Sequence, residues 1–93
     1  MRYIGNAFSL AMIRDEHFPL IRVEICDRPT GEFVSGVGHQ DTANVLGVAF
    51  NRVSLLLNEG DELYVAQFQG GRLPEGATTL PEGSTFKWLR VSL

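Results

Sequence analysis

The chain has 93 residues, 44% of them apolar, which is enough for one small domain with a modest core. Its formal net charge of -3 argues against a general nucleic-acid binder, which normally presents a basic surface, so no duplex DNA partner is expected. Cys26 is the single cysteine, which excludes an internal disulfide and a structural cysteine-based zinc site. We expect one domain over residues 1–93, and its small size favours burial against a second copy.

No targeting or membrane-spanning segment is evident. The apolar run near the N-terminus is interrupted at Gly5 and Asn6 and is too short to span a bilayer. Cys26 lies in an alternating apolar run, where we expect it to be a small core residue, and an unpaired thiol fits a reducing compartment. A cytoplasmic location without membrane contact is therefore expected.

Short apolar or alternating segments predict about five strands. The candidate segments, in chain order, are residues 2–5, 19–26, 32–38, 52–57, 62–68 and 86–93. Two hairpins are expected, one turning through "DRPTGE" (27–32) and one through "NEGD" (58–61). In the second strand, Ile21, Val23 and Ile25 share one face.

Two helical segments are expected between these strands. Ser9 is placed to cap a helix of one or two turns. Asp41 or Thr42 supplies the N-cap of a second, amphipathic helix. Its apolar stripe consists of Val45, Leu46, Ala49 and Phe50. Gly47 inside this helix costs about 1 kcal/mol relative to alanine, so we expect it to allow close packing. The fold class is therefore α+β, a sandwich-like arrangement of a mixed sheet with flanking helices.

The one long irregular region, residues 69–85, is rich in Gly, Pro and Thr. It contains "LPEG" twice, at 73–76 and 80–83, and the two copies are expected to make similar turns.

Three polar side chains are candidates for chemistry. His39 stands in "GVGHQDTANVLG", where glycines at 36 and 38 would let the backbone approach a ligand and the following helix start would suit a phosphate. Arg72 and Glu75 lie on the irregular segment that leaves a strand, a common place for functional residues. The residues alone favour an idle turn residue over a catalytic one at His39, and the Arg72–Glu75 pair could be only a local ion pair.

His17, in the charged connector "RDEHF", is expected to be idle. The two histidines and one cysteine lack metal-ligand spacing, and no phosphate-binding or nucleophile motif is present.

The segments "YIGNAFSLAM", "VGHQDTANVLG", "NRVSLLLNEGDELYVAQF" and "GRLPEG" resemble, in this order and spacing, the viral anti-CRISPR ring nuclease family. The resemblance covers roughly residues 2–80. Members of that family are small proteins of archaeal viruses, bacteriophages and some prokaryotic genomes. They destroy cyclic tetra-adenylate, the second messenger of type III CRISPR defence.

The resemblance implies a set of site residues. His39 corresponds to the catalytic histidine, and Arg72 and Glu75 to the active-site arginine and glutamate. The substrate-binding residues that it implies are Asn6, Ala7, Phe8, Ser9, Gly38 and Thr42. The family fold is a sheet of about five strands with flanking helices, in a two-fold homodimer that holds cyclic tetra-adenylate at its interface.

The activity implied by the resemblance is that of a phosphodiesterase without metal or other cofactor, acting in a prokaryotic cell or an infected host cell. A ribose 2′-OH would attack the neighbouring phosphorus, and the ring would yield linear di-adenylates with 2′,3′-cyclic phosphate ends, which would switch off the effectors of type III CRISPR defence. The segment "ATTLPEGST" departs from the family, whose members usually continue into a helix there, so the cover of the site or part of the dimer surface is expected to differ.

Two alternatives of other classes remain. One is a binding module that sequesters a cyclic nucleotide or a protein partner without turnover. The other is a structural, dimeric viral protein.

Overall fold

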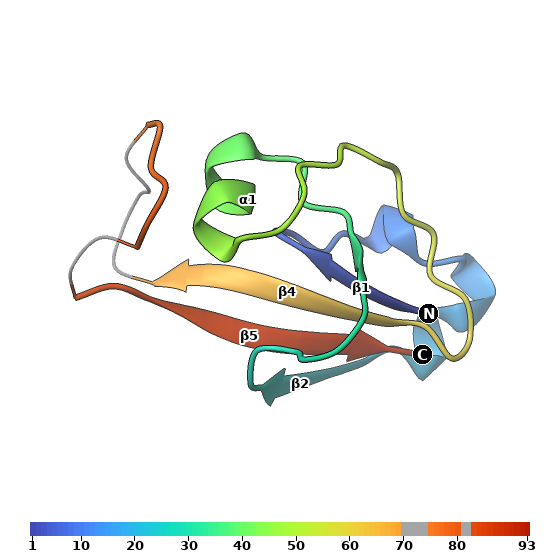
Figure 1. Ribbon diagram of the computed structural model, residues 1–93. Coiled ribbons are helices and arrows are strands. Elements are labelled where there is room, and N and C mark those ends of the chain that lie inside the picture. Colours follow the sequence, from blue (N-terminus) through green and yellow to red (C-terminus); the bar gives the residue numbers. More distant parts are fainter. Residues whose placement is uncertain (70–74, 81–82) are drawn as a thin grey trace.

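The computed structural model describes residues 1–69, 75–80 and 83–93. At its centre is a five-stranded sheet in the order β2-β5-β4-β1-β3 (Figure 1). The strands are β1 (Arg2–Gly5), β2 (Arg22–Cys26), β3 (Val34–Ser35), β4 (Glu62–Gln69) and β5 (Thr85–Ser92). The helices are α1 (Gln40–Leu46) and two 3-10 helices, η1 (Leu10–Met12) and η2 (Asp15–Leu20). The predicted α+β class with a mixed sheet is confirmed.

The strand directions bring two chain segments to the same end of the sheet. β1 is parallel to both β3 and β4, whereas β5 is antiparallel to β4 and β2. Because β1 and β3 are parallel neighbours, their carboxyl ends lie side by side at the same end of the sheet. There the Gly36 N–H donates to the Ile4 carbonyl at 2.8 Å. The segments that follow these two strands therefore start side by side.

The core has two parts, one on each face of the sheet. On the face that α1 covers, the buried residues are Ile4, Val37, Ala43, Leu46, Tyr64, Ala66 and Trp88. On the other face they are Ile13, Leu57, Leu63, Val65 and Val91. β4 contributes alternating residues to both parts, so this central strand is apolar throughout its middle rather than on one side.

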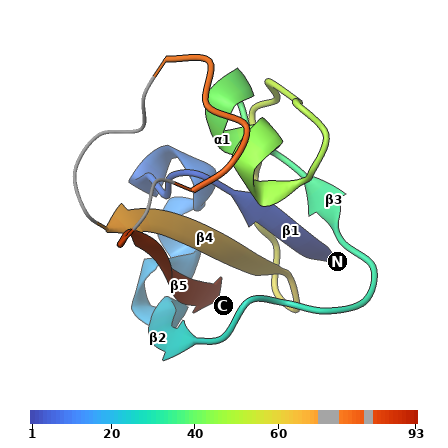
Figure 2. The same cartoon turned by 60° about the vertical axis from the view of Figure 1, so that its left-hand side comes forward.

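The predicted hairpin over residues 19–38 is wrong. β2 and β3 lie at opposite edges of the sheet, and the chain between them crosses the molecule (Figure 2). Arg28 fastens this crossing by donating to the Leu46 carbonyl at 2.6 Å, and its guanidinium lies 5.9 Å from the Trp88 ring centre. Pro29 and Gly31 mark a change of direction, but such local signals do not select a strand's partner.

The second predicted hairpin is also wrong, although its turn is present. Asp61 N–H donates to the Asn58 carbonyl at 3.0 Å, and Gly60 has a φ of 89°. Residues 52–57, however, form no named strand and make only an isolated parallel bridge between Leu57 and Ile13. β4 already pairs with β1 and β5, so no edge of β4 is free for them.

The ends of α1 differ from the prediction. His39, not Asp41 or Thr42, is the N-cap, and it makes no side-chain capping hydrogen bond. Gly47 is the left-handed C-cap, with a φ of 71°, instead of an interior residue. A Cβ on Gly47 would meet nothing within 4 Å, so the expected close packing is wrong as well.

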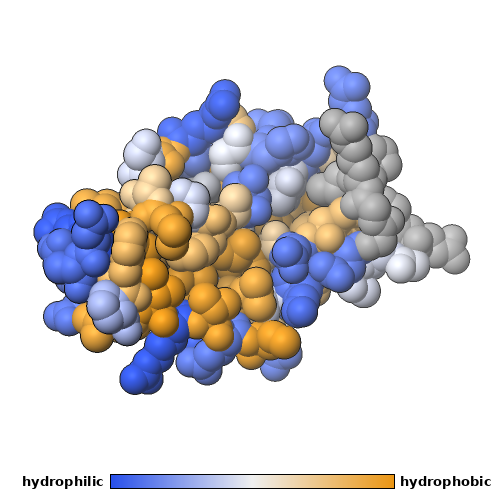
Figure 3. All heavy atoms as spheres, turned by 180° about the vertical axis from the view of Figure 1, so that it is seen from behind, coloured by the Kyte–Doolittle hydropathy of each residue, from blue (hydrophilic) through white to orange (hydrophobic). Residues whose placement is uncertain are grey.

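Several local predictions are confirmed. Ser9 caps η1 by accepting from the Ala11 N–H at 3.1 Å, and the first and last strands are β1 and β5. Cys26 is half-buried and packs against the core on the α1 face. Val23 and Ile25 do share a face of β2, yet they are 53% and 73% exposed. Figure 3 shows a continuous hydrophobic area on the side behind the view of Figure 1.

Candidate functional site

A pocket of about 410 Å³ opens where the carboxyl ends of β1 and β3 meet. Its walls come from residues 5–7 at the end of β1, from Gly36 and Gly38 after β3, and from residues 52–55, with Met12 of η1. The ends of parallel strands are a frequent location for ligand sites, because loops from neighbouring strands converge there. This pocket, which we call the β1–β3 pocket, is therefore the candidate site.

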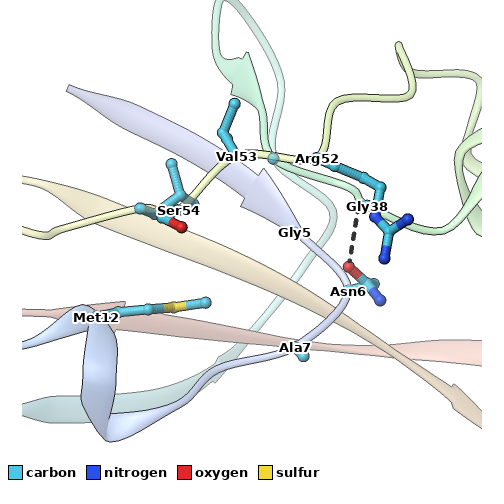
Figure 4. Close-up of a pocket in the computed structure, with 10 residues that line it drawn as sticks. Gly5, Asn6, Ala7, Met12, Gly38, Arg52, Val53 and Ser54 are labelled. Carbon is cyan, nitrogen blue, oxygen red and sulfur yellow. Dashed lines mark hydrogen bonds between the residues drawn. The ribbon is translucent and has the colours of Figure 1, made fainter.

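Asn6 and Gly38 connect the two sides of the pocket. The Gly38 N–H donates to Asn6 Oδ1 at 3.4 Å, and Figure 4 shows this contact with the Arg52 guanidinium beside it. Asn6 is exposed, so its amide nitrogen stays available to a ligand. Of the predicted substrate-binding residues, Asn6, Ala7 and Gly38 line the pocket.

The two glycines of "GVGH" make room for side chains of the protein itself. A Cβ on Gly36 would lie 2.8 Å from Leu55 Cδ1, and a Cβ on Gly38 would lie 3.3 Å from Arg52 Cγ. Within the fold, these glycines leave space for the passage of residues 52–55 across them. Both also line the pocket, and their role in the approach of a ligand stays a prediction.

Arg52 is the residue that the sequence analysis missed. The sequence predicts it at the start of a strand, and no motif singles it out. The preceding segment is tied to β3, since Asn51 donates from Nδ2 to the Ser35 carbonyl at 2.7 Å and from its N–H to the Val37 carbonyl at 2.8 Å. These two bonds bring the exposed Arg52 guanidinium to the pocket. Within the described residues, no carboxylate lies within ion-pairing distance of it.

His39 stands next to the pocket as the exposed N-cap of α1. Its carbonyl accepts from the Ala43 N–H at 3.0 Å, which is the first turn of the helix. Its imidazole makes no hydrogen bond to any residue that the structure describes, so both ring nitrogens can meet a ligand. The seven-residue length of α1 and Asp41 in its first turn weaken the expected phosphate seat at the helix start.

The turn that carries Glu75 lies against the start of α1. The Gly76 N–H donates to Asp41 Oδ2 at 3.0 Å, and both views of the chain show this turn beside the helix (Figures 1 and 2). Asp41 is two residues after His39, and Gly76 directly follows Glu75, so the two predicted residues belong to contacting segments. Arg72, and with it the predicted Arg72–Glu75 ion pair, lies outside the described residues.

The other three predicted substrate-binding residues do not line the β1–β3 pocket. Phe8 packs against the core on the face opposite α1, and Ser9 is the cap of η1. Thr42 is half-buried on α1 and does not line the β1–β3 pocket.

Neither a membrane-spanning helix nor a cluster of metal ligands is found among the described residues. No helix there is long and apolar enough to cross a membrane. No three His, Cys, Asp or Glu side chains of this described part are grouped so that they could hold a metal ion.

Comparison with known proteins gives the family. The STIV B116-like family matches residues 2–84, which is most of the chain. The solved structure of B116 of Sulfolobus turreted icosahedral virus is similar in fold, with a TM-score of 0.74 and 24% sequence identity over 99% of this chain and 98% of that one. No curated protein matches the chain in sequence. The family match covers both strands that form the pocket, the α1 start and the Glu75 turn, and the chain therefore belongs to the STIV B116-like family.

Proposed function

We propose that the protein is a metal-independent phosphodiesterase that opens cyclic tetra-adenylate into linear di-adenylates. The observation that carries this proposal is the β1–β3 pocket, which Asn6, Gly38 and the cationic Arg52 line and from which the chain continues directly into His39. The ordered motifs that resemble the ring nuclease family name the substrate. The fold similarity to a viral protein fits a role in an infected prokaryotic cell, where removal of the messenger would switch off type III CRISPR effectors.

The chemistry requires alignment, charge stabilisation and a proton donor. A ribose 2′-OH attacks the adjacent phosphorus in line, the bond to the departing 5′-oxygen breaks, and a 2′,3′-cyclic phosphate forms. Arg52, whose planar guanidinium can donate to two oxygens of one phosphate, stabilises the developing charge. Arg72 would add a second guanidinium, as the resemblance implies.

His39 supplies the proton that the departing 5′-oxygen needs, and the 2′-OH proton passes to a base. Imidazole suits such transfers because histidine exchanges protons near neutral pH. Glu75, on the turn against α1, either orients His39 or takes the 2′-OH proton.

A two-fold homodimer is part of the proposal, because a four-fold repeating ring matches two symmetric sites and two cuts give two identical products. A domain of this size with exposed aliphatic side chains such as Ile25 and Leu10 also has apolar surface left to cover.

The test incubates the purified protein with cyclic tetra-adenylate in excess chelator and separates the products by chromatography. We expect linear di-adenylate, and the same sample should have a mass in solution of twice the 10.3 kDa of one chain. If the ring is recovered intact but raises the melting temperature of the protein, the result would instead support the binding module that sequesters the ring. Intact ring with no thermal shift would leave the structural viral protein.

His39→Ala separates catalysis from binding. Loss of the proton donor should reduce single-turnover cleavage by about 10² to 10⁴-fold, while the affinity for the ring changes little. His17→Ala is the matched control, because His17 lies in η2 and does not line the pocket. Unchanged cleavage by His39→Ala would refute the assignment of His39.

A further inference from the structure

Asp41 connects the two segments that carry His39 and Glu75. Its Oδ2 accepts the Gly76 N–H at 3.0 Å across 35 positions of sequence. This hydrogen bond joins the first turn of α1 to a backbone group of the turn after β4. Hydrogen bonds to an ionised carboxylate are stronger and shorter than neutral ones.

The backbone conformation of Gly76 directs its N–H toward Asp41. Gly76 has a φ of 76°, a left-handed conformation that glycine adopts without strain and that turns its N–H toward α1. Asp41 itself sits in the first helical turn, where the free N–H groups of the helix start favour a negative charge. Within the described part of the chain, no cation forms a salt bridge with this carboxylate.

We propose that Asp41 is a positioning residue that holds the Glu75 turn against the start of α1 and so sets Glu75 relative to His39. The proposal rests on the proposed ring-opening function for its catalytic consequence, but not for the contact itself. Asp41 lies outside the β1–β3 pocket and acts through Glu75, without touching the substrate.

The experiment uses the full chain, four test variants and one control variant. Asp41→Ala removes the acceptor, Asp41→Asn keeps an acceptor oxygen, Glu75→Ala removes the residue that is positioned, and Asp41→Ala with Glu75→Ala combines the two. Asp15→Ala is the control, because Asp15 is an exposed acid in the first turn of another helix. Circular dichroism and thermal melting establish that each variant is folded.

The first readout is hydrogen exchange of the Gly76 amide by NMR, which does not require activity. We expect exchange to accelerate about tenfold in Asp41→Ala and to stay near the wild-type rate in Asp41→Asn and Asp15→Ala. An unchanged Gly76 exchange rate in Asp41→Ala would overturn the contact.

The second readout is cleavage of cyclic tetra-adenylate. Asp41→Ala should lower kcat about tenfold with little change in KM, and Asp41→Asn should restore it. In the Glu75→Ala background the same change should have almost no further effect, because both substitutions remove one function. Additive losses, or full activity in Asp41→Ala, would overturn the positioning role. If the wild-type protein cleaves nothing, the proposed function and the catalytic consequence fail together, whereas the amide exchange still decides the contact.

Discussion

At the scale of single residues, the candidate site combines side chains that differ in how they are held. The Gly38 N–H donates to Asn6 Oδ1, and Arg52 is brought to them by the two bonds of its neighbour Asn51 to Ser35 and Val37. The His39 carbonyl accepts from the Ala43 N–H, whereas its imidazole makes no hydrogen bond to a residue that the structure describes. For the proposed ring opening, different residues would then align the ring and transfer the proton.

The residue that sequence patterns overlooked is the one whose substitution tests the pocket most directly. Arg52→Gln should weaken binding of cyclic tetra-adenylate about tenfold, because it removes a charged donor to phosphate. Arg52→Lys should recover part of that loss, since it keeps the charge without the planar fork. Affinity is measured in the His39→Ala background so that the ring stays intact.

The control for this prediction is Arg14→Gln, because Arg14 is exposed and does not line the pocket. The melting temperature should not change in either variant, as Arg52 is exposed. Equal affinities of the Arg52→Gln and wild-type pockets would mean that the ligand does not reach this arginine.

At the scale of elements, periodicity identified most segments and turn residues misassigned their connections. The predicted segments include all five strands β1 to β5, whereas residues 52–57, also predicted as a strand, cross Gly36 and Gly38 instead. Leu57 is buried and Leu55 packs against the core on the face opposite α1, although neither belongs to a named strand, whereas Val53 and Leu56 are 48% and 43% exposed. The apolar run therefore marks a segment that is packed in part, and such packing occurs in strands and in irregular segments alike.

The end of α1 supplies a prediction for an element boundary. Gly47→Ala should lower the free energy of unfolding by about 1 kcal/mol, because Gly47 has a φ of 71° and an L side chain is strained there. A Cβ would have no neighbour within 4 Å, so the effect comes from the backbone alone. Gly47→Asn should cost less, since asparagine tolerates the left-handed region better. Chemical denaturation measures both, and an alanine variant as stable as wild type would contradict the C-cap assignment.

At the scale of the whole molecule, the start of the chain is joined to the turn before the central strand. The N-terminal ammonium of Met1 lies 2.9 Å from Asp61 Oδ1, and the Asn58 N–H donates to Asp61 Oδ2 at 2.9 Å. Burial acts to raise the pKa of Asp61, but the Asn58 hydrogen bond and the ammonium outweigh it and the pKa is lowered. This carboxylate therefore ties β1 and β4 together in its charged form.

The lowered pKa gives stability a defined dependence on pH. A carboxyl whose pKa is lower in the folded protein stabilises it above the ordinary value of 3.8, and this contribution is lost as pH falls through the folded value. Asp61→Asn should thus be less stable than wild type by about 1 kcal/mol at neutral pH, with a difference that shrinks below about pH 4.

Melting temperatures measured from neutral to acidic pH test this prediction. Glu59→Gln, a change in the same turn at an exposed residue, is the control and should follow wild type throughout. A stability difference for Asp61→Asn that persists undiminished in acid would exclude the charged contact as its cause.

Local sequence pattern was sufficient to predict the mixed α+β class, the Ser9 cap and the turn before β4. It also placed His39 and Glu75 outside regular elements. Alternation and turn residues act within a few positions of the chain, so they can be recognised in the sequence alone. It could not select strand partners. The hairpin through Pro29 and Gly31 failed since the partner of β2 is β5, more than 60 residues later, and that choice depends on which apolar faces can be buried together. The same limit applies to the site. Only the parallel pairing of β1 with β3 brings Asn6 to Gly38, and only the packing of residues 52–55 over two glycines adds Arg52.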